Sequence, residues 1–331
     1  MIEQIDSKIY RIEIPLPDSP LRATNSYFIR GDERNLLIDN GFNMTECMTA
    51  MGDAQKKLNF SLDDTDLFLT HLHSDHIGLT GQLARQNTKI YAGKYTEHCL
   101  RLPEDDSFFT PFIIQSGLEL MGIPSDDPTI HPGYEFAPTL FASDNVQILE
   151  EELVINIGDL QFRCVSTPGH APDHFCLYEE RKKILITGDH ILGTITPNNT
   201  IWEDPWEVEK DYLGMYLENL DRFKDFEIDI ALPGHRAIIE DCHGRIAGLK
   251  EHHAERLNLV LNILDDGKPY TGAQVTERMR WDIKAKSWDD FPVAQKIFAT
   301  GEALSHISHL MFLGQIEKQL DGGVVYYTRV K

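Results

Sequence analysis

The sequence predicts an α/β protein with a small helical unit at its C-terminal end. Over residues 1–247, short apolar runs of strand character, such as Leu160–Thr167, alternate with segments of helical spacing. From residue 248 the pattern is mainly helical and ends in two short strands, which Asp321-Gly322-Gly323 joins as a hairpin signal. We therefore expect two domains, 1–247 and 248–331. Three helices closed by a hairpin predict a winged-helix-like second domain.

The elements of both domains follow from periodicity and turn residues. Lys8–Ile14 alternates apolar and polar residues as a half-buried strand does, and the turn Gly31-Asp32-Glu33-Arg34 separates two apolar runs. Further predicted strands are Asn25–Arg30, Asn35–Asp39, Asp66–Thr70, Lys89–Ala92, Leu160–Thr167, Phe175–Glu179, Lys183–Thr187, Ile228–Leu232, Gln315–Leu320 and Val324–Val330. Predicted helices are Asn43–Leu58, Ile77–Gln86, Val208–Phe223, Glu251–Leu264, Thr271–Arg280 and Val293–Phe312.

Residues 100–152 interrupt this pattern. They contain six prolines, eleven acidic residues and a single basic residue, Arg101. No long periodic element fits the segment, so we interpret it as an inserted lid or loop region with short helices. No residue pattern within it indicates chemistry.

The chain is strongly acidic, and the acidity lies in the first domain. It holds 53 acidic and 31 basic side chains, which give a formal net charge of −22. Residues 248–331 contain eleven of each sign, so the whole excess belongs to residues 1–247. Because general nucleic-acid binding relies on cationic side chains, we do not expect a nucleic-acid partner.

Apolar runs and cysteines indicate a cytoplasmic protein. No stretch approaches the roughly 18 uninterrupted apolar residues of a membrane span, and the N-terminus lacks the basic and apolar regions of a secretory signal. We therefore expect no membrane partner. The five cysteines are scattered without C-x-x-C spacing, which favours free thiols in a reducing compartment.

The side chains able to bind a metal or take part in catalysis are concentrated in Thr70–Gly78, which reads THLHSDHIG. His71 and His73 are two residues apart, so an extended backbone turns both side chains to one side. Asp75 and His76 follow where the chain turns into a predicted helix. Three imidazoles and a carboxylate so close together are costly to bury alone. A transition metal removes that cost, because these groups are its usual ligands.

Three further candidates each lie just beyond a predicted strand. His170, Asp189 and His235 each directly follow a glycine at the end of such a strand. Glycine permits a tight turn and a close approach of the backbone to an ion. One such residue alone would be an ordinary loop residue, but the repetition predicts a shared site.

The run His71-x-His73-x-Asp75-His76, followed in order by these three strand-end residues, resembles the metallo-β-lactamase superfamily. The resemblance covers about residues 1–99 and 153–247 and leaves out the insertion. It implies a four-layer αβ/βα sandwich, with two sheets face to face, helices outside and metals at the sheet edge. The second domain is similar to the short winged-helix tail of some hydrolases in this superfamily, including endoribonuclease-type members.

The resemblance also implies two divalent metal ions, with Zn²⁺ as the first expectation and iron or manganese as alternatives. It assigns His71, His73 and His170 to the first ion, Asp75, His76 and His235 to the second, and Asp189 to both. Diiron, oxygen-reducing members typically carry a glutamate where this chain has His73, which favours zinc and hydrolysis.

These assignments predict a binuclear hydrolase of an ester, thioester or lactone, in the glyoxalase-II-like group, with a small acyl compound as substrate. A metal-bridging hydroxide would attack the carbonyl carbon, and Asp75 would orient this nucleophile as the catalytic residue. Three alternatives stay open on the same ligands. They are a metal-dependent endoribonuclease, an iron-dependent oxygenase of a thiol or persulfide, and a binding protein without turnover.

Four residues are candidates for supporting the site or lining its pocket. Asp39 ends a strand where family members often place a supporting aspartate, and a turn cap is the alternative. His174 would act as a hydrogen-bond donor to the site, or simply pack. His190 and Tyr212 would border the pocket. We expect the second domain to pack over the active site or to form a homodimer, with nucleic-acid contact as the alternative.

Overall fold

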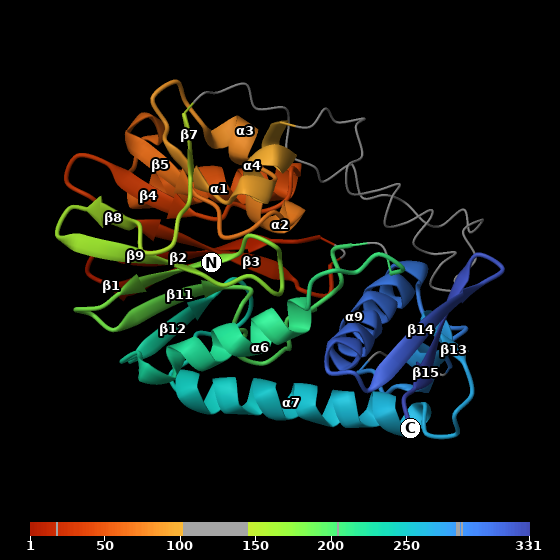
Figure 1. Cartoon of the computed structure of the whole chain (residues 1–331). Coiled ribbons are helices and arrows are strands. Elements are labelled where there is room, and N and C mark those ends of the chain that lie inside the picture. The colour runs from red at the N-terminus through yellow and green to blue at the C-terminus, as the bar shows by residue number, and fades with distance from the viewer. Residues whose placement is uncertain (18, 102–144, 204, 283–284, 286) are drawn as a thin grey trace. The chain divides into compact units, whose positions relative to one another are not determined.

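The structure of the chain is a computed structural model (Figure 1). It describes all residues except 18, 102–144, 204, 283–284 and 286. Most of the predicted insertion at 100–152 lies outside the described residues, and its interpretation as a lid stays a prediction. Among the described helices, none is both long enough and apolar enough to span a membrane.

The described residues form two compact units. Among the described residues, the first unit contains 1–101, 145–197 and 223–245. Among these residues, the second unit contains 198–222 and 246–331.

One sheet of the first unit has seven described strands in the order β1 to β7. Neighbouring strands are antiparallel from β1 to β4 and parallel from β4 to β7. The parallel half therefore directs the carboxyl ends of β4, β5 and β6 to one edge. The strands are β1 Ile2–Asp6, β2 Ile9–Pro15, β3 Ala23–Ile29, β4 Asn35–Ile38, β5 Thr65–Phe68, β6 Ile90–Ala92 and β7 Val146–Ile148.

The other sheet of this unit has five described strands in the order β12-β11-β10-β9-β8. β11 and β12 are parallel, and the remaining pairs are antiparallel. The strands are β8 Val154–Ile157, β9 Leu160–Ser166, β10 Phe175–Glu179, β11 Ile184–Gly188 and β12 Ile230–Pro233.

The two sheets share one apolar core. Tyr27 and Phe68 of the first sheet belong to the same cluster of buried side chains as Phe162 and Leu232 of the second. The Tyr27 hydroxyl also donates a hydrogen bond of 2.8 Å to the carbonyl oxygen of Pro233, at the end of β12. Apolar burial and this bond together hold the sheets face to face.

Helices cover the outer face of the seven-stranded sheet (Figure 1). Cys47 and Met51 on α1 are buried in one cluster with Phe28, Leu37 and Leu67 of the strands. This unit therefore contains three of the four layers that the resemblance implies, a helical layer and two facing sheets. Its helical elements are α1 Thr45–Leu58, η1 Leu62–Asp64, α2 Ser74–Ile77, α3 Thr80–Leu83, α4 Lys94–Arg101 and η4 Phe223–Asp225.

The single helix predicted at Ile77–Gln86 is wrong, because the chain forms the short helices α2 and α3 instead. Gly78, between them, lies against the backbone of a neighbouring loop. A Cβ there would be 2.5 Å from the amide nitrogen of Asn43. The Thr80 hydroxyl donates to the carbonyl oxygen of Ile77 at 2.7 Å, which provides a partner for a carbonyl at the end of α2.

The second unit contains helices and a three-stranded sheet of order β13-β15-β14. β14 and β15 pair antiparallel around Gly322 and Gly323, whose φ angles are 57° and 82°, so the predicted hairpin is confirmed. Its elements are α6 Tyr212–Arg222, α7 Cys242–Ile263, β13 Tyr270–Thr271, α8 Gly272–Arg278, α9 Val293–Phe312, β14 Ile316–Asp321 and β15 Val324–Arg329. Their winged-helix character stays a prediction.

α7 begins at Cys242, well before the predicted start at Glu251. Asp241 caps its first turn, because its Oδ1 accepts the amide N–H of Gly244 at 2.8 Å. Gly244 and Gly248 are poor helix formers, which explains why periodicity alone placed the start too late. The division between the two units falls within this helix, after Arg245.

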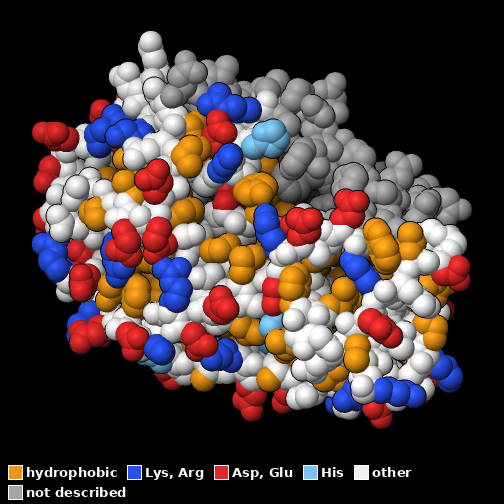
Figure 2. Space-filling model, in the orientation of Figure 1, with side chains coloured by type: hydrophobic (Ala, Val, Ile, Leu, Met, Phe, Trp, Pro, Cys, Tyr) orange, Lys and Arg blue, Asp and Glu red, His pale blue; other side chains and the backbone are white. Residues whose placement is uncertain are grey.

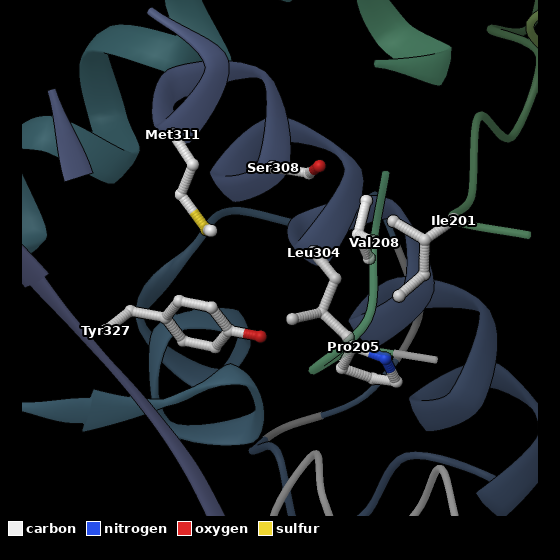
Figure 3. Close-up of a pocket in the computed structure, with 7 residues that line it drawn as sticks. All are labelled: Ile201, Pro205, Val208, Leu304, Ser308, Met311 and Tyr327. Atoms are coloured by element: carbon white, nitrogen blue, oxygen red, sulfur yellow. The ribbon is translucent and has the colours of Figure 1, made fainter. Parts of the chain in front are cut away.

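Figure 3 shows a small cavity in the second unit, next to α9. Its lining is apolar except for the hydroxyl groups of Ser308 and Tyr327. The lining residues are Ile201, Pro205, Val208, Leu304, Ser308, Met311 and Tyr327. None of the seven is a carboxylate, an imidazole or a thiol, so the cavity is not a candidate metal or catalytic site.

A buried chain of hydrogen bonds links α7 and α9. His306 Nδ1 donates to the carbonyl oxygen of Glu302 at 2.8 Å, so His306 Nε2 accepts from His253 Nδ1 at 3.0 Å. His253 Nε2 then accepts from the side-chain amide of Asn199 at 3.3 Å. Both imidazoles are therefore neutral. Burial lowers the pKa of His306 to about 3 and that of His253 well below its ordinary range, and the cationic Arg256 nearby adds to both shifts.

We expect this pair to make the folded chain less stable below pH 6.5. An unfolded histidine titrates near 6.5, whereas His306 titrates near 3, so the unfolded chain binds more protons between these values. The stability contributed by neutral His306 is complete above pH 6.5. It falls by about 1.4 kcal/mol for each pH unit between 6.5 and the pKa of the folded state. Urea unfolding of the native chain and of His306→Gln at pH 7 and pH 5 measures the loss. An equal loss in both chains would contradict this assignment.

Candidate metal centre

Loops of the first unit bring the seven predicted ligand residues together. His71, His73, Asp75 and His76 follow β5, whereas the other three follow β9, β11 and β12 of the second sheet. Six of the seven side chains are buried, and His73 is half-buried. The predicted ligands are His71, His73, Asp75, His76, His170, Asp189 and His235.

Local backbone geometry explains how one short segment supplies four of them. His73 has an extended backbone, with φ −63° and ψ 140°, and directly precedes α2. His71 and His73 therefore project to the same side, and their ring centroids lie 4.7 Å apart. The first turn of α2 then brings His76 back, so that its ring centroid lies 4.1 Å from that of His71.

The first group of ligand atoms consists of three ring nitrogens. His71 Nε2 lies 2.9 Å from His73 Nδ1, and His170 Nε2 lies 3.1 Å from the same atom. Three imidazoles converging in this way can hold a metal ion. The two ends of the group come from different sheets, because His170 follows β9.

The second group combines a carboxylate with two ring nitrogens. Asp75 Oδ2 lies 3.2 Å from His235 Nε2 and 3.7 Å from His76 Nε2. These three side chains also converge closely enough to hold a metal ion.

Asp189 lies between the two groups. Its Oδ1 is 3.5 Å from His76 Nε2, and its Oδ2 is 3.3 Å from His235 Nε2. The same Oδ2 is 3.7 Å from His170 Nε2 of the first group. One carboxylate thus reaches ligands of both groups, which is the arrangement that a bridging ligand needs.

Hydrogen bonds on the outer side of the rings fix their orientation. His76 Nδ1 donates to Asp39 Oδ2 at 2.7 Å, and His235 Nδ1 donates to the carbonyl oxygen of Ala23 at 2.8 Å. Each bond occupies the outer nitrogen and leaves Nε2 directed into the site. Asp39 also accepts the backbone N–H and the hydroxyl of Thr70, at 2.9 Å and 2.8 Å. The Thr70 oxygen in turn lies 2.9 Å from His71 Nδ1.

The other predicted supporting residues have different surroundings. His174 Nδ1 donates to the Thr167 hydroxyl at 2.7 Å, and its Nε2 accepts the backbone N–H of Asp189 at 3.1 Å. His174 therefore supports Asp189 as an acceptor, whereas the sequence predicts a donor.

His190 is buried, and its ring centroid lies 6.0 Å from that of His174. Tyr212 belongs to the second unit, where its hydroxyl lies 3.4 Å from Glu203, and its pocket role stays a prediction.

Two imidazoles of the first group, His71 and His73, are held in the neutral state. Burial lowers the pKa of His71 well below its ordinary range, and the nearby His76 adds to the shift. Burial likewise lowers the pKa of His73 to about 3, with a further contribution from His170. Neutral imidazole is the form that binds a metal.

The second group attracts positive charge. Burial opposes the charged form of His235, but Asp189 and Asp75 outweigh it and raise its pKa to about 10. The carboxylates of Asp39, Asp75 and Asp189 likewise raise the pKa of His76 well above its ordinary range, against the effect of burial. Burial would raise the pKa of Asp75, yet the adjacent histidines lower it to about 2. The buried carboxylates of this group thus favour positive charge beside them, either on the imidazoles or on a bound metal ion.

The donor atoms fit divalent metal ions. Asp75 Oδ2, His76 Nε2, Asp189 Oδ1 and His235 Nε2 are buried and make no hydrogen bond within the described residues. Such orphaned polar atoms are costly unless an ion contacts them. Gly234 keeps space beside them, because a Cβ there would overlap Asp189 Oδ1 and lie 2.9 Å from His76 Cε1.

Some supporting residues gave no recognised signal in the sequence. Ala23 and Asn25 hold a ligand loop by hydrogen bonds but lie in no recognised motif, and Thr70 opens the histidine-rich segment without a role of its own being predicted. The available clue was the run Thr24-Asn25-Ser26, three polar residues in an otherwise mostly apolar strand. Every residue of this strand except Ala23 is buried.

Fold and site together define a metal-binding α/β protein with ligands at the edge of two facing sheets. A model of the metallo-beta-lactamase superfamily matches residues 19–235, most of the chain. The chain therefore belongs to the metallo-β-lactamase superfamily, and the fold class predicted from the sequence is confirmed.

Two curated relatives are hydrolases by name. The chain is 24 % identical over 286 residues to the atrochrysone carboxyl ACP thioesterase dmxR1 of Cryptosporiopsis sp. (strain 8999), covering 86 % of this chain and 71 % of that protein. It is 25 % identical over 315 residues to the probable metallo-hydrolase YqjP of Bacillus subtilis (strain 168), covering 92 % and 93 % of the two chains. These relatives support a hydrolase.

Solved structures share the fold over nearly the whole chain. A metallo-beta-lactamase family protein from Thermus thermophilus superposes with a TM-score of 0.81 at 24 % identity, covering 99 % of this chain and 100 % of that one. A beta-lactamase domain protein from Burkholderia ambifaria gives a TM-score of 0.80 at 24 % identity, covering 99 % and 93 %. The C-terminal unit is thus part of the shared architecture.

We expect Gly234→Ala to lower metal affinity by at least tenfold, because the added methyl group displaces the Asp189 carboxylate. Gly52→Ala on α1 is the matched control, since a Cβ there meets nothing within 4 Å. Metal content after dialysis against a weak chelator measures the effect. Equal metal content in both variants would contradict the close approach at Gly234.

We expect Asp189→Ala to lose bound metal as well as activity, because one carboxylate reaches both groups of ligands. Elemental analysis of the purified variant measures metal per chain. Glu179→Gln is the control, because Glu179 is also buried but bonds to Arg181 and Lys182 instead. Retention of two ions by Asp189→Ala would contradict the bridging assignment.

Proposed function

We propose that the protein is a metal-dependent hydrolase that cleaves an ester, thioester or lactone with two divalent metal ions. The observation that carries the proposal is the pair of buried ligand groups joined by Asp189. The name of the relative described as a carboxyl ACP thioesterase supports an acyl substrate. We propose Zn²⁺ as the ion, because imidazole and carboxylate ligands in buried sites suit it.

The chain's own residues would hold the ions and orient the attacking water. His71, His73 and His170 would hold one ion, and Asp75, His76 and His235 the other, with Asp189 shared. Bound at these positions, two divalent ions would supply an acidified water and a positive partner for the carbonyl oxygen. Asp75 would orient the attacking water, because its Oδ2 lies at the second group and makes no hydrogen bond within the described chain.

The charge balance favours an anionic transition state. Two divalent ions carry four positive charges, and Asp75 and Asp189 together carry two negative ones. The surplus would attract the developing oxyanion of a carbonyl substrate. The buried carboxylate of Asp39 offsets part of it through His76, to which it is bonded at 2.7 Å.

The same charges argue against a nucleic-acid substrate. The chain carries a net charge of −22, and Figure 2 shows Lys and Arg side chains interspersed among Asp and Glu on the visible face. A polyanion would be repelled on average at low salt. We therefore propose a small acyl compound as substrate. The cytoplasmic location and the homodimer stay predictions.

A panel of substrates tests the proposal. We expect the zinc-loaded chain to hydrolyse acyl-thioesters, esters or lactones, and the double variant His71→Ala, His73→Ala to lose at least a thousandfold in rate. His243→Ala is the control, because His243 lies exposed on α7. Phosphodiester cleavage alone would favour the nuclease alternative, and oxygen consumption by an iron-loaded chain would favour the oxygenase. Equal rates in the double variant and the native chain would remove the proposed site.

A further inference from the structure

The start of β3 contacts the loops that carry the second group of ligands. Residues Ala23, Thr24 and Asn25 open this strand, and Thr24 and Asn25 are at most 2 % exposed. They lie far in sequence from both loops, which follow β5 and β12. We call this three-residue segment the β3 strap.

Asn25 fixes the loop of His235 from both sides. Its side-chain amide donates to the carbonyl oxygens of Pro233 and Arg236, each at 2.9 Å. Its backbone N–H donates to the carbonyl oxygen of Gly234 at 2.7 Å. Three carbonyl groups of the loop are thus tied to one residue, and they flank His235 on both sides.

The other two residues of the strap complete the arrangement. The carbonyl oxygen of Ala23 accepts from His235 Nδ1 at 2.8 Å, so the ring itself is held. The Thr24 hydroxyl donates to the backbone carbonyl oxygen of Asp75 at 3.0 Å. The strap therefore contacts two ligand residues that belong to the second group.

The loop also has a strained backbone position beside these bonds. Arg236 has φ 68°, in the left-handed region that a residue with a side chain adopts at a cost. Its carbonyl oxygen accepts from the Asn25 amide at 2.9 Å and from Arg11 Nη1 at 3.3 Å. Without the Asn25 amide, the loop loses the hydrogen bonds to the carbonyl oxygens of Pro233 and Arg236 on either side of His235, so we expect its imidazole to be held less firmly.

We propose that the β3 strap sets the affinity of the second metal subsite, with Asn25 as its positioning residue. The inference rests on the two-ion site proposed above. The first group is held differently, since His71 is oriented by Thr70 and Asp39. Loss of the Asn25 amide should therefore weaken one ion and spare the other.

The test is a calorimetric titration of the metal-stripped full chain with Zn²⁺ alone. We expect the native chain to bind two ions. Asn25→Ala should bind the first with unchanged affinity and the second about 10- to 100-fold more weakly, the range seen when a partner of a metal ligand is removed. Asn35→Ala is the matched control. Asn35 is also a buried strand asparagine, but it opens β4, at the end remote from Asp39, and bonds to Asp64 and Thr65.

A second readout separates positioning from simple loss of structure. The hydrolytic rate of Asn25→Ala should recover as the zinc concentration is raised, whereas a misfolded chain would not recover. Unchanged affinity for both ions in a folded Asn25→Ala, or an equal loss of both, would overturn the inference. If this variant does not fold, Thr24→Val decides by the same titration, and an unchanged second affinity again overturns it. A native chain that binds one ion only would instead overturn the two-ion site, and the inference with it.

Discussion

The concentration of ionisable side chains at one buried place is the constraint on which the rest of the structure depends. Five imidazoles and two carboxylates meet there, and four of their atoms make no hydrogen bond within the described chain. Without cations such a cluster opposes folding, because buried charges and unpaired polar atoms are costly. The two sheets, the outer hydrogen bonds and the glycines can be understood as means of holding this cluster in place. Asp39 is the clearest case, since one carboxylate orients His76 and fixes Thr70 at the same time.

Much of this was predictable because the ligands obey a simple rule of position. Asp189 and His235, like His170, directly follow a glycine at the end of a predicted strand, and this repetition together with the family resemblance grouped them with His71 without coordinates. Alternation and apolar runs also located most strands. The hairpin at Gly322 and Gly323 was predictable because few other residues adopt the required φ angles.

The remainder depended on tertiary contacts that leave no periodic trace. The helix predicted over Ile77–Gln86 breaks because Gly78 packs against the backbone of a distant loop, which no local pattern records. The support from Ala23 and Asn25 was missed because main-chain carbonyl partners are independent of side-chain identity. His174 was recognised as a supporting residue, but its role as an acceptor follows from the Thr167 hydroxyl, which fixes the ring tautomer. Spacing in the sequence cannot give a tautomer.

The division of the ligands between the two sheets has a consequence for how the chain matures. The seven-stranded sheet supplies His71, His73, Asp75 and His76, whereas the five-stranded sheet supplies the other three. Under the proposed ligand assignment neither half can complete a coordination sphere, so an ion would bind tightly only after the halves have docked. Bound metal would then stabilise that docked state, and the added stability would grow with the logarithm of the free metal concentration. Removal of the metal would thereby also lower the stability of the assembled sandwich.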